Sequence, residues 1–260
     1  MSGQCDVRNE DDAANPLLKG AEATAYRAIT ARMNFLSQDR ADLQYSVKEV
    51  SRWMSAPRKQ DWEALKRVGK YLLYKPRPTI FYKWQKAPNE LTIFTDTDWA
   101  GCRTTRRSTS GGAILHGDHL IKSYSKMQNL VYLSSAEGEL YGVVRASSEA
   151  LGCQSLARDL GCSRDIRVYA DASAALGIVH RKGLGKVRHL DTSTLWVQQA
   201  AHSKVIHYDK ILGTLNPADM MTKHLAEPTR KIHVARLFNE WLEGRSKQAI
   251  KLCKGTTEEK

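Results

Sequence analysis

The sequence predicts an α/β fold in which a mixed five-stranded sheet, with three antiparallel and two parallel strands, is flanked by helices and follows an N-terminal helical segment. Apolar residues recur with helical spacing up to residue 78 and with a period of two beyond it. Three strand patterns then follow one another across short turns, and two later strands are each reached through a helix. Strands joined by tight turns pair antiparallel, whereas a helical crossover brings the next strand in parallel.

Residues 20–78 show three helical stripes of apolar residues, and residues 1–19 are expected to be a flexible lead-in. Pro57 separates the second stripe from the third, and Pro76 with Pro78 ends the third, because proline cannot continue a helix. The stripes are Tyr26, Ile29, Met33 and Leu36; Leu43, Val47, Val50 and Met54; and Trp62, Leu65, Val68 and Leu72.

The central strand of the expected sheet begins at Leu91 and runs directly into Asp96. Before it, Thr79–Trp84 has the composition of a further strand. After it come strands over 110–115 and 119–125, joined by a Gly-Asp pair that is typical of a hairpin turn. The three strands from Leu91 onward should therefore form an antiparallel meander.

The second half of the expected domain alternates helices with strands. A long helix is predicted over 135–160, where Gly161 provides a C-terminal stop. The remaining elements, in order, are a strand over 166–170, a helix over 172–179, a helix over 190–201, a strand over 205–211, a helix capped by Asn216 that runs to Lys223, and one amphipathic helix in the tail, with Ile232, Leu237, Phe238 and Trp241 on its apolar face.

At 260 residues the chain can hold one large domain, or a smaller domain of about 130 residues with additions. We expect four parts. They are the lead-in at 1–19, the helical segment at 20–78, the sheet domain at 79–226, and a C-terminal helix with a charged tail at 227–260.

Composition limits the functional classes. The net charge of +12 favours a polyanionic partner, either nucleic acid or an anionic membrane surface. The five cysteines are odd in number and form no CxxC pair, which argues against a disulfide framework or a zinc knuckle and indicates a reducing, intracellular compartment. No apolar run approaches the roughly 18 residues needed to span a bilayer.

Four acids stand where the fold could bring them together. Asp96 and Asp171 each end a strand, Glu139 lies in the first turns of the long helix, and Asp219 begins a late helix. Carboxylate oxygens are the ligands that Mg²⁺ prefers, so these acids suit a divalent-metal centre for phosphodiester hydrolysis. Each also has an ordinary explanation, as an N-cap for Asp171 or Asp219, a surface residue for Glu139 and a turn former for Asp96. Asp98, two residues beyond Asp96, is an alternative to it.

Four motifs carry a resemblance to a known family. They are TDTDWAGCRTTRRSTSG at 95–111, LSSAEGELYG at 133–142, YADASAALGI at 169–178 and NPADMMTKHL at 216–225. With the stretch at 26–72, they make the chain similar to the ribonuclease H region of copia-type retrotransposon polyproteins, preceded by the end of their reverse transcriptase. The resemblance covers about 20–230, and it implies a ribonuclease H-like mixed sheet.

The same resemblance implies a function. The chain would be a metal-dependent endonuclease that hydrolyses the RNA strand of RNA–DNA hybrids, with two Mg²⁺ ions (Mn²⁺ as a substitute) held by Asp96, Glu139, Asp171 and Asp219. The alternative is a domesticated, non-catalytic nucleic-acid-binding or scaffold subunit of a larger assembly. Expected partners are an RNA–DNA hybrid or other nucleic acid, and the remainder of a reverse transcriptase or a larger ribonucleoprotein assembly, with no membrane. The paired-aspartate motif of the polymerase is absent from this sequence, so DNA synthesis is not expected.

Basic residues near the acids should hold the nucleic-acid backbone, because they flank the acidic strand in sequence or by strand pairing. Ordinary solvated surface charge is the alternative. One departure from the family lies nearby, since Ser193 and Leu195 stand where the family commonly has Arg and His. The residues expected in the groove are Arg103, Arg106, Arg107, Lys122, Arg188 and His189.

Overall fold

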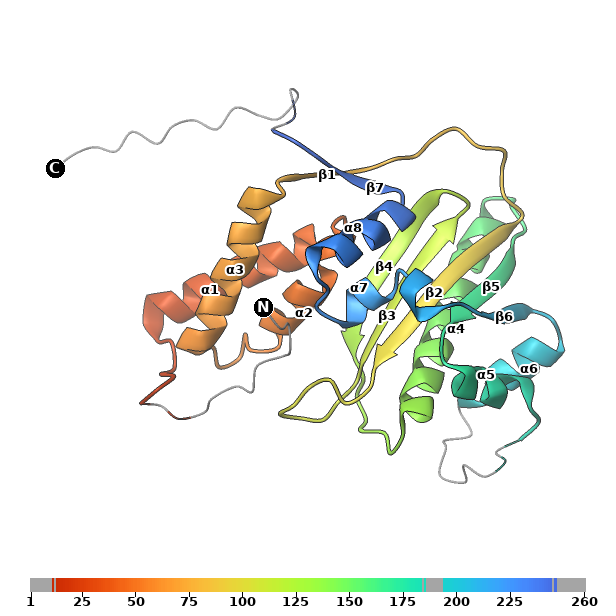
Figure 1. The fold of residues 1–260 in the computed structure, drawn as a ribbon, viewed down its shortest axis with the longest axis horizontal. Helices are drawn as coiled ribbons and strands as arrows, with labels where there is room; N and C mark the ends of the chain where they lie inside the picture. Colours follow the sequence, from red (N-terminus) through yellow and green to blue (C-terminus); the bar gives the residue numbers. More distant parts are fainter. Residues whose placement is uncertain (1–10, 12, 184, 186–193, 245, 247–260) are drawn as a thin grey trace.

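The computed structural model describes residues 11, 13–183, 185, 194–244 and 246, and its centre is a five-stranded sheet of order β4-β3-β2-β5-β6 (Figure 1). The pairs β2–β3 and β3–β4 are antiparallel, whereas β2–β5 and β5–β6 are parallel. The predicted mixed sheet is therefore confirmed. Its strands are β2 (Glu90–Asp98), β3 (Thr109–His116), β4 (His119–Met127), β5 (Asp165–Ala170) and β6 (Ile206–Lys210).

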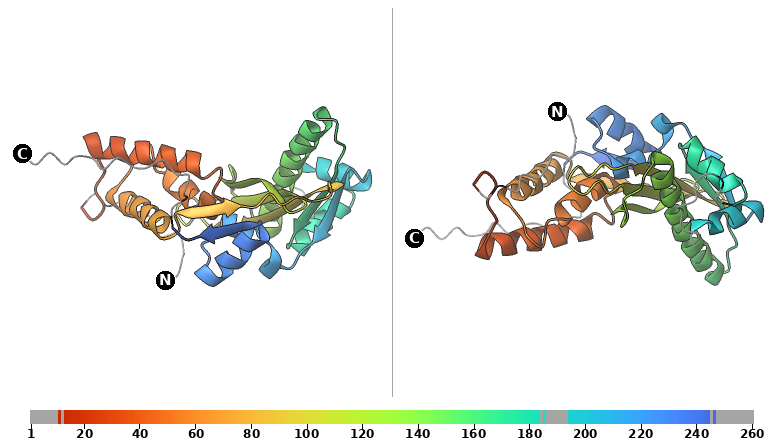
Figure 2. Two further views of the ribbon diagram at one scale, coloured as in Figure 1. Left: turned by 90° about the horizontal axis from the view of Figure 1, so that it is seen from above. Right: turned by 90° about the horizontal axis from the view of Figure 1, so that it is seen from below.

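Helices cover both faces of this sheet, and Figure 2 shows α4 and α8 on opposite sides of it. On one face, α4 (Ser135–Asp159) packs with α5 (Ser173–His180) and α6 (Trp196–His202) over an apolar core drawn from β2, β5 and β6. The other face carries α7 (Asp219–Thr222) and α8 (Glu227–Arg236) over a smaller apolar cluster with β3. Of the helix expected over 190–201, only the part from residue 194 onward is described.

The start of α4 is fixed by reciprocal capping, which matters because Glu139 lies in its first turns. The Ser134 hydroxyl accepts a hydrogen bond from the Glu137 backbone N–H at 3.3 Å. In return, the Glu137 carboxylate accepts one from the Leu133 N–H at 3.1 Å. The first bond satisfies an N–H that would otherwise lack a partner in the first turn of the helix, and the second holds the residue that precedes the N-cap Ser134.

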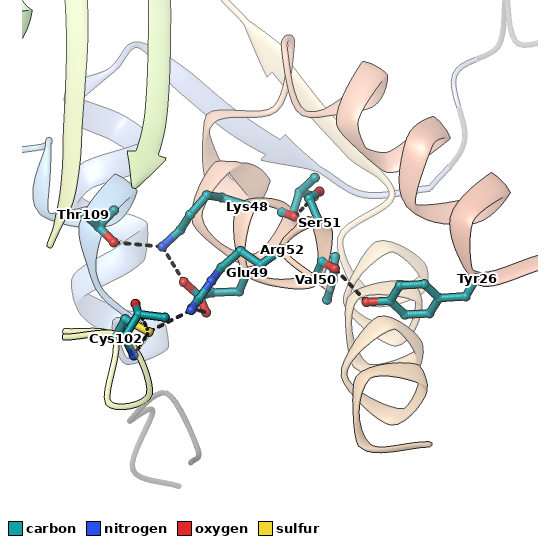
Figure 3. Close-up of polar contacts among 10 residues, drawn as sticks. Tyr26, Lys48, Glu49, Val50, Ser51, Arg52, Cys102 and Thr109 are labelled. Atoms are coloured by element: carbon teal, nitrogen blue, oxygen red, sulfur yellow. Dashed lines mark hydrogen bonds and ion pairs between the residues drawn. The ribbon is translucent and has the colours of Figure 1, made fainter. Parts of the chain in front are cut away.

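The N-terminal helices form a unit beside β4 rather than over the sheet (Figures 1 and 2). α1 (Gly20–Leu36), α2 (Gln44–Ser51) and α3 (Lys59–Tyr74), with a short 3₁₀ turn at Ala41–Leu43, share their own apolar core. Within it, the buried Tyr26 hydroxyl donates to the Val50 carbonyl at 2.7 Å (Figure 3). The three predicted helices are therefore present.

Helix α2 joins this unit to the sheet domain, as Figure 3 shows. Lys48 Nζ donates to Thr109 Oγ1 at the start of β3 over 2.9 Å. The Arg52 guanidinium donates to Cys102 Sγ at 2.7 Å and is itself held by Glu49 at 2.9 Å. The loop that follows β2 is thus attached to the helical segment by a charged network.

Two expectations about strands and the tail are wrong. The strand expected over 79–84 is instead β1 (Arg77–Ile80), which pairs antiparallel with β7 (Asn239–Leu242) in a separate two-stranded sheet. The helix expected to carry Trp241 ends at Arg236, and Trp241 lies in β7, where pairing with the distant β1 decides its conformation. The four-part division of the chain stays a prediction.

Within the described ranges, no helix combines the length and the apolar character that crossing a membrane requires.

Candidate metal centre

Three carboxylates converge where β2, β5 and α4 meet. Asp96 lies near the end of β2, Glu139 lies in the first turns of α4 and Asp171 directly follows β5. Each offers a carboxylate oxygen, and these atoms lie within 4.8 Å of one another. Parallel strands end at the same edge of a sheet, which explains why β2 and β5 bring their terminal acids together.

Glycines allow the elements to approach closely enough to form this group. A Cβ at Gly142 of α4 would lie 2.4 Å from Thr97 Oγ1, so only glycine fits against β2 at that point. A Cβ at Gly111, the β3 partner of Asp96, would lie 2.6 Å from Met221 Cβ of α7. The missing side chains therefore let α4 and α7 close on Asp96 from opposite faces.

Asp219 lies at the start of α7, outside the three-acid set, and Lys223 links it to that set. Lys223 Nζ is 3.1 Å from Asp219 Oδ1 and 3.5 Å from Asp96 Oδ2. The Thr222 hydroxyl also donates to Asp96 Oδ2. Asn216 Nδ2 donates to the Thr95 carbonyl at 2.9 Å, which attaches the segment before α7 to β2.

Neither Asp171 nor Asp219 is a helix N-cap. The N-cap of α5 is Ala172 and that of α7 is Ala218, and neither makes a side-chain cap bond. The ordinary explanation for these two acids therefore does not apply in the structure. Asn216 does accept a hydrogen bond from the Ala218 N–H at 3.2 Å, so the turn before α7 still has a local side-chain partner.

Burial and mutual repulsion make the ionised acids unfavourable without a cation. Desolvation, followed by the charges of Asp96 and Asp171, raises the pKa of Glu139 to about 9. Desolvation and the charge of Asp96 raise the pKa of Asp219 to about 6 and also raise the pKa of Asp171. Desolvation alone would lower the pKa of Lys223, but the charges of Asp96 and Asp219 outweigh it and raise that pKa.

The donor set fits a hard divalent cation. Glu139 Oε2 is buried and has no hydrogen-bond partner among the described residues. The Glu139 carboxylate lies beside those of Asp96 and Asp171, which gives an all-carboxylate group, the chemistry that Mg²⁺ and Mn²⁺ accept. Asp98 is not in this group, and burial raises the pKa of its carboxyl, which packs against Gly101 in the turn after β2.

Three of the arginines expected to bind nucleic acid lie in the loop between β2 and β3. Arg103, Arg106 and Arg107 are all exposed, and the loop begins directly after the acidic end of β2. Cys102 ties the loop to α2 through Arg52 (Figure 3). Burial alone would raise the pKa of the Cys102 thiol, but hydrogen bonds from Thr105 and Arg52 outweigh it and lower that pKa.

The other residues predicted to contact the nucleic-acid backbone do not lie in this loop. Lys122 on β4 pairs with Glu149 of α4 at 2.6 Å. Glu149 lies ten residues beyond Glu139, or about 15 Å along the helix. Lys122 is therefore held away from the acids, and its contact with nucleic acid stays a prediction. Arg188 and His189 lie outside the described residues.

Sequence reasoning did not assign Lys223, Thr222 or Asn216 to the site, and it treated Asn216 only as a helix cap and Lys223 only as the end of that helix. All three lie within the motif at 216–225. The spacing of Asp219 and Lys223, however, is that of an ordinary i,i+4 helix pair. Only the fold shows that the same ammonium also contacts a strand residue from the centre of the sheet.

Comparison with known proteins places the chain in context. No protein-family model matches it. The retrovirus-related Pol polyprotein from transposon RE2 of Arabidopsis thaliana is 30% identical over 226 residues, which cover 83% of this chain and 15% of that polyprotein. The polyprotein from transposon RE1 of the same plant is 30% identical over 213 residues, covering 80% and 14%. The chain is homologous to copia-type Pol polyproteins.

This homology confirms the resemblance carried by the four motifs. The chain spans only about 15% of the length of these relatives. Among solved structures, the N-terminal ribonuclease H domain of a Mycobacterium tuberculosis protein is 21% identical, with a TM-score of 0.35. That similarity covers 51% of this chain and 90% of that one.

Proposed function

We propose that this copia-type segment is a divalent-metal-dependent nuclease that hydrolyses the RNA strand of RNA–DNA hybrids by a two-metal mechanism. The observation that carries the proposal is the convergence of Asp96, Glu139 and Asp171 within 4.8 Å, in a buried position where their charges repel one another. A fold gains nothing in stability from such repulsion, so a bound cation is the simplest reason to retain it.

The acids have distinct places in this proposal. Asp96, Glu139 and Asp171 would hold one ion, and Asp96 with Asp219 would hold the other. When bound, the ions supply charge neutralisation at the phosphate and a water of lowered pKa. Asp96 is the shared ligand. Its carboxylate is almost fully buried and is oriented by the Thr222 hydroxyl and the close packing of β3.

The exposed arginines of the loop at 99–108 would bind the nucleic acid rather than the metal ions. They lie in the loop that directly follows the acidic strand, so they can contact the phosphates of a duplex whose scissile bond meets the acids. Phosphate contacts are independent of base sequence, which suits an enzyme that acts on hybrids in general. Selection of the RNA strand would depend on the 2′-hydroxyl, which is the group that distinguishes RNA from DNA.

The test is cleavage of an end-labelled RNA–DNA hybrid by the purified chain with Mg²⁺. Duplex DNA and duplex RNA of the same sequence are the controls. We expect the RNA strand of the hybrid to be cut, and no cleavage when EDTA replaces the metal. Hybrid binding without cleavage under Mg²⁺ and Mn²⁺ would contradict the proposal and favour the non-catalytic binding subunit.

A further inference from the structure

Lys223 lies against two of the proposed metal ligands. Its ammonium is 3.1 Å from Asp219 Oδ1 and 3.5 Å from Asp96 Oδ2. The Asp96 side chain is only 2% exposed and that of Asp219 is 18% exposed, whereas the lysine side chain is 40% exposed. The ammonium therefore reaches the buried Asp96 carboxylate and the partly buried Asp219 carboxylate from the solvent side.

This contact is more than a surface helix pair. Asp219 and Lys223 have i,i+4 spacing, and such a pair alone contributes little when both members are exposed. Here the same ammonium also contacts Asp96 in the middle of the sheet. It thus bridges the two carboxylates that the proposed function assigns to one of the two metal ions.

Among the described residues, the neighbouring three-acid position of Asp96, Glu139 and Asp171 has no cation paired with Glu139 or Asp171. Glu139 Oε2 has no hydrogen-bond partner among the described residues, and no ion pair of Lys223 with Glu139 or Asp171 is present in that part of the chain. The cluster therefore contains two positions of different character. At one, three carboxylates converge, and at the other an ammonium already balances two carboxylates.

We propose that Lys223 is a built-in counter-cation at the Asp96–Asp219 position, and that a divalent ion binding there must displace it. This inference rests on the proposed function for its choice of ligands. It assigns unequal ion affinities to the two positions, because one ion fills the three-acid group directly whereas the other competes with the lysine. The side chain is long and partly exposed, so its ammonium can withdraw toward solvent without a change in the backbone.

The test is ion binding to the whole chain without substrate, measured by isothermal titration calorimetry with Mn²⁺. In the wild type we expect one stronger and one weaker binding event. Lys223→Met should tighten the weaker event on the order of tenfold or more, because it removes a competing cation held at contact distance beside the buried Asp96 carboxylate and its neighbour Asp219. The stronger event should change much less.

Two variants serve as controls. Lys223→Arg keeps a cation at the position and should leave the weaker event near its wild-type affinity. Lys231→Met, on the exposed face of α8, also lowers the net charge by one but leaves Lys223 in contact with Asp96 and Asp219. It therefore reports the general effect of net charge on ion binding. Equal ion numbers and affinities in Lys223→Met and Lys231→Met would overturn the inference.

A measurement on the wild type guards against misfolding of the Met variant. During a Mg²⁺ titration followed by NMR, the Lys223 side-chain signals, assigned by comparison with Lys223→Arg, should shift with the second binding event. Signals that stay unchanged through saturation would also overturn the inference.

Tightened ion binding in a chain that cuts no hybrid would refute the proposed function alone. Hybrid cleavage with unaltered ion binding in Lys223→Met would refute the lysine's role alone.

Discussion

Glu139 shows how strongly the surroundings of a buried carboxyl group can change its pKa. Its pKa is raised to about 9 from an ordinary 4.5, first by burial and then by Asp96 and Asp171. Between those two values, the folded state holds a proton that the unfolded state releases. Stability from this group is therefore fully present below pH 4.5 and is lost as the pH rises toward 9.

We therefore expect the metal-free protein to lose stability from pH 5 to pH 9, as Asp219 and then Glu139 are forced to ionise in the folded state. A bound divalent ion favours the ionised acids, so the rise in Tm caused by Mg²⁺ should grow over the same range. Thermal unfolding in EDTA and in Mg²⁺ at several pH values measures both effects.

Glu139→Gln is the matched control for this titration, since it keeps the side-chain size and cannot ionise. Its metal-free stability should depend less on pH than that of the wild type. A wild-type Mg²⁺ effect that shrinks toward alkaline pH would contradict this account of the cluster.

At the scale of elements, the close approach of α4 to β2 holds the cluster together. A Cβ at Gly142 would lie 2.4 Å from the side chain of the buried Thr97. We expect Gly142→Ala to destabilise the fold by about 1–3 kcal/mol, because the helix must move away from the strand. Chemical denaturation measures this loss, and Mg²⁺ binding should weaken along with it.

Gly152 of the same helix provides the control for that substitution, because a Cβ there meets nothing within 4 Å. Gly152→Ala should stabilise the helix by roughly 0.5–1 kcal/mol through the better helix propensity of alanine. If both alanine variants were equally stable, the steric explanation for Gly142 would be wrong.

The elements differ in how far the sequence could predict them. The meander, the long helix and the two later strands follow from local patterns that end at turn residues, as at Gly117 and Gly161. The β1–β7 pair could not be found in this way. Its strands are four residues long and lie on opposite sides of the domain in sequence, so neither carries enough local signal.

The residues of the candidate site also differ in how far the sequence could predict them. Three of the four predicted acids meet within 4.8 Å because strand ends and helix starts have fixed places in this fold. Lys223 could not be predicted, since its second contact, with Asp96, depends on how α7 packs against the sheet. Its i,i+4 contact with Asp219 gives no indication of that packing.

For the molecule as a whole, the expected partner is a polyanion that meets the loop at 99–108. We expect Arg106→Ala with Arg107→Ala to weaken hybrid binding for every sequence and to reduce the salt dependence of log K by about two, or about one per lost phosphate contact. Fluorescence anisotropy at several salt concentrations measures both quantities.

The control removes two exposed positive charges from α3, with Arg67→Ala and Lys70→Ala. These residues lie on the helical segment rather than in the loop after β2, so the salt dependence should stay close to that of the wild type. A loop variant with an unchanged salt slope would show that Arg106 and Arg107 are ordinary surface charges.

The central claim is that Asp96, Glu139 and Asp171 form a metal-dependent hydrolytic centre, and Asp171→Asn tests it most directly. The substitution keeps the side-chain size, and it relieves repulsion within a cluster where the pKa of Asp171 is raised. Folding and hybrid binding should therefore stay nearly intact.

The decisive measurement is the Mg²⁺-dependent cleavage rate of a labelled RNA–DNA hybrid by wild type and by Asp171→Asn, with hybrid affinity and Tm measured on the same preparations. We predict a rate loss of at least about a hundredfold, because a metal ligand is lost while the fold is retained. A variant that cleaves as fast as the wild type would contradict the assignment of Asp171, and with it the three-acid centre.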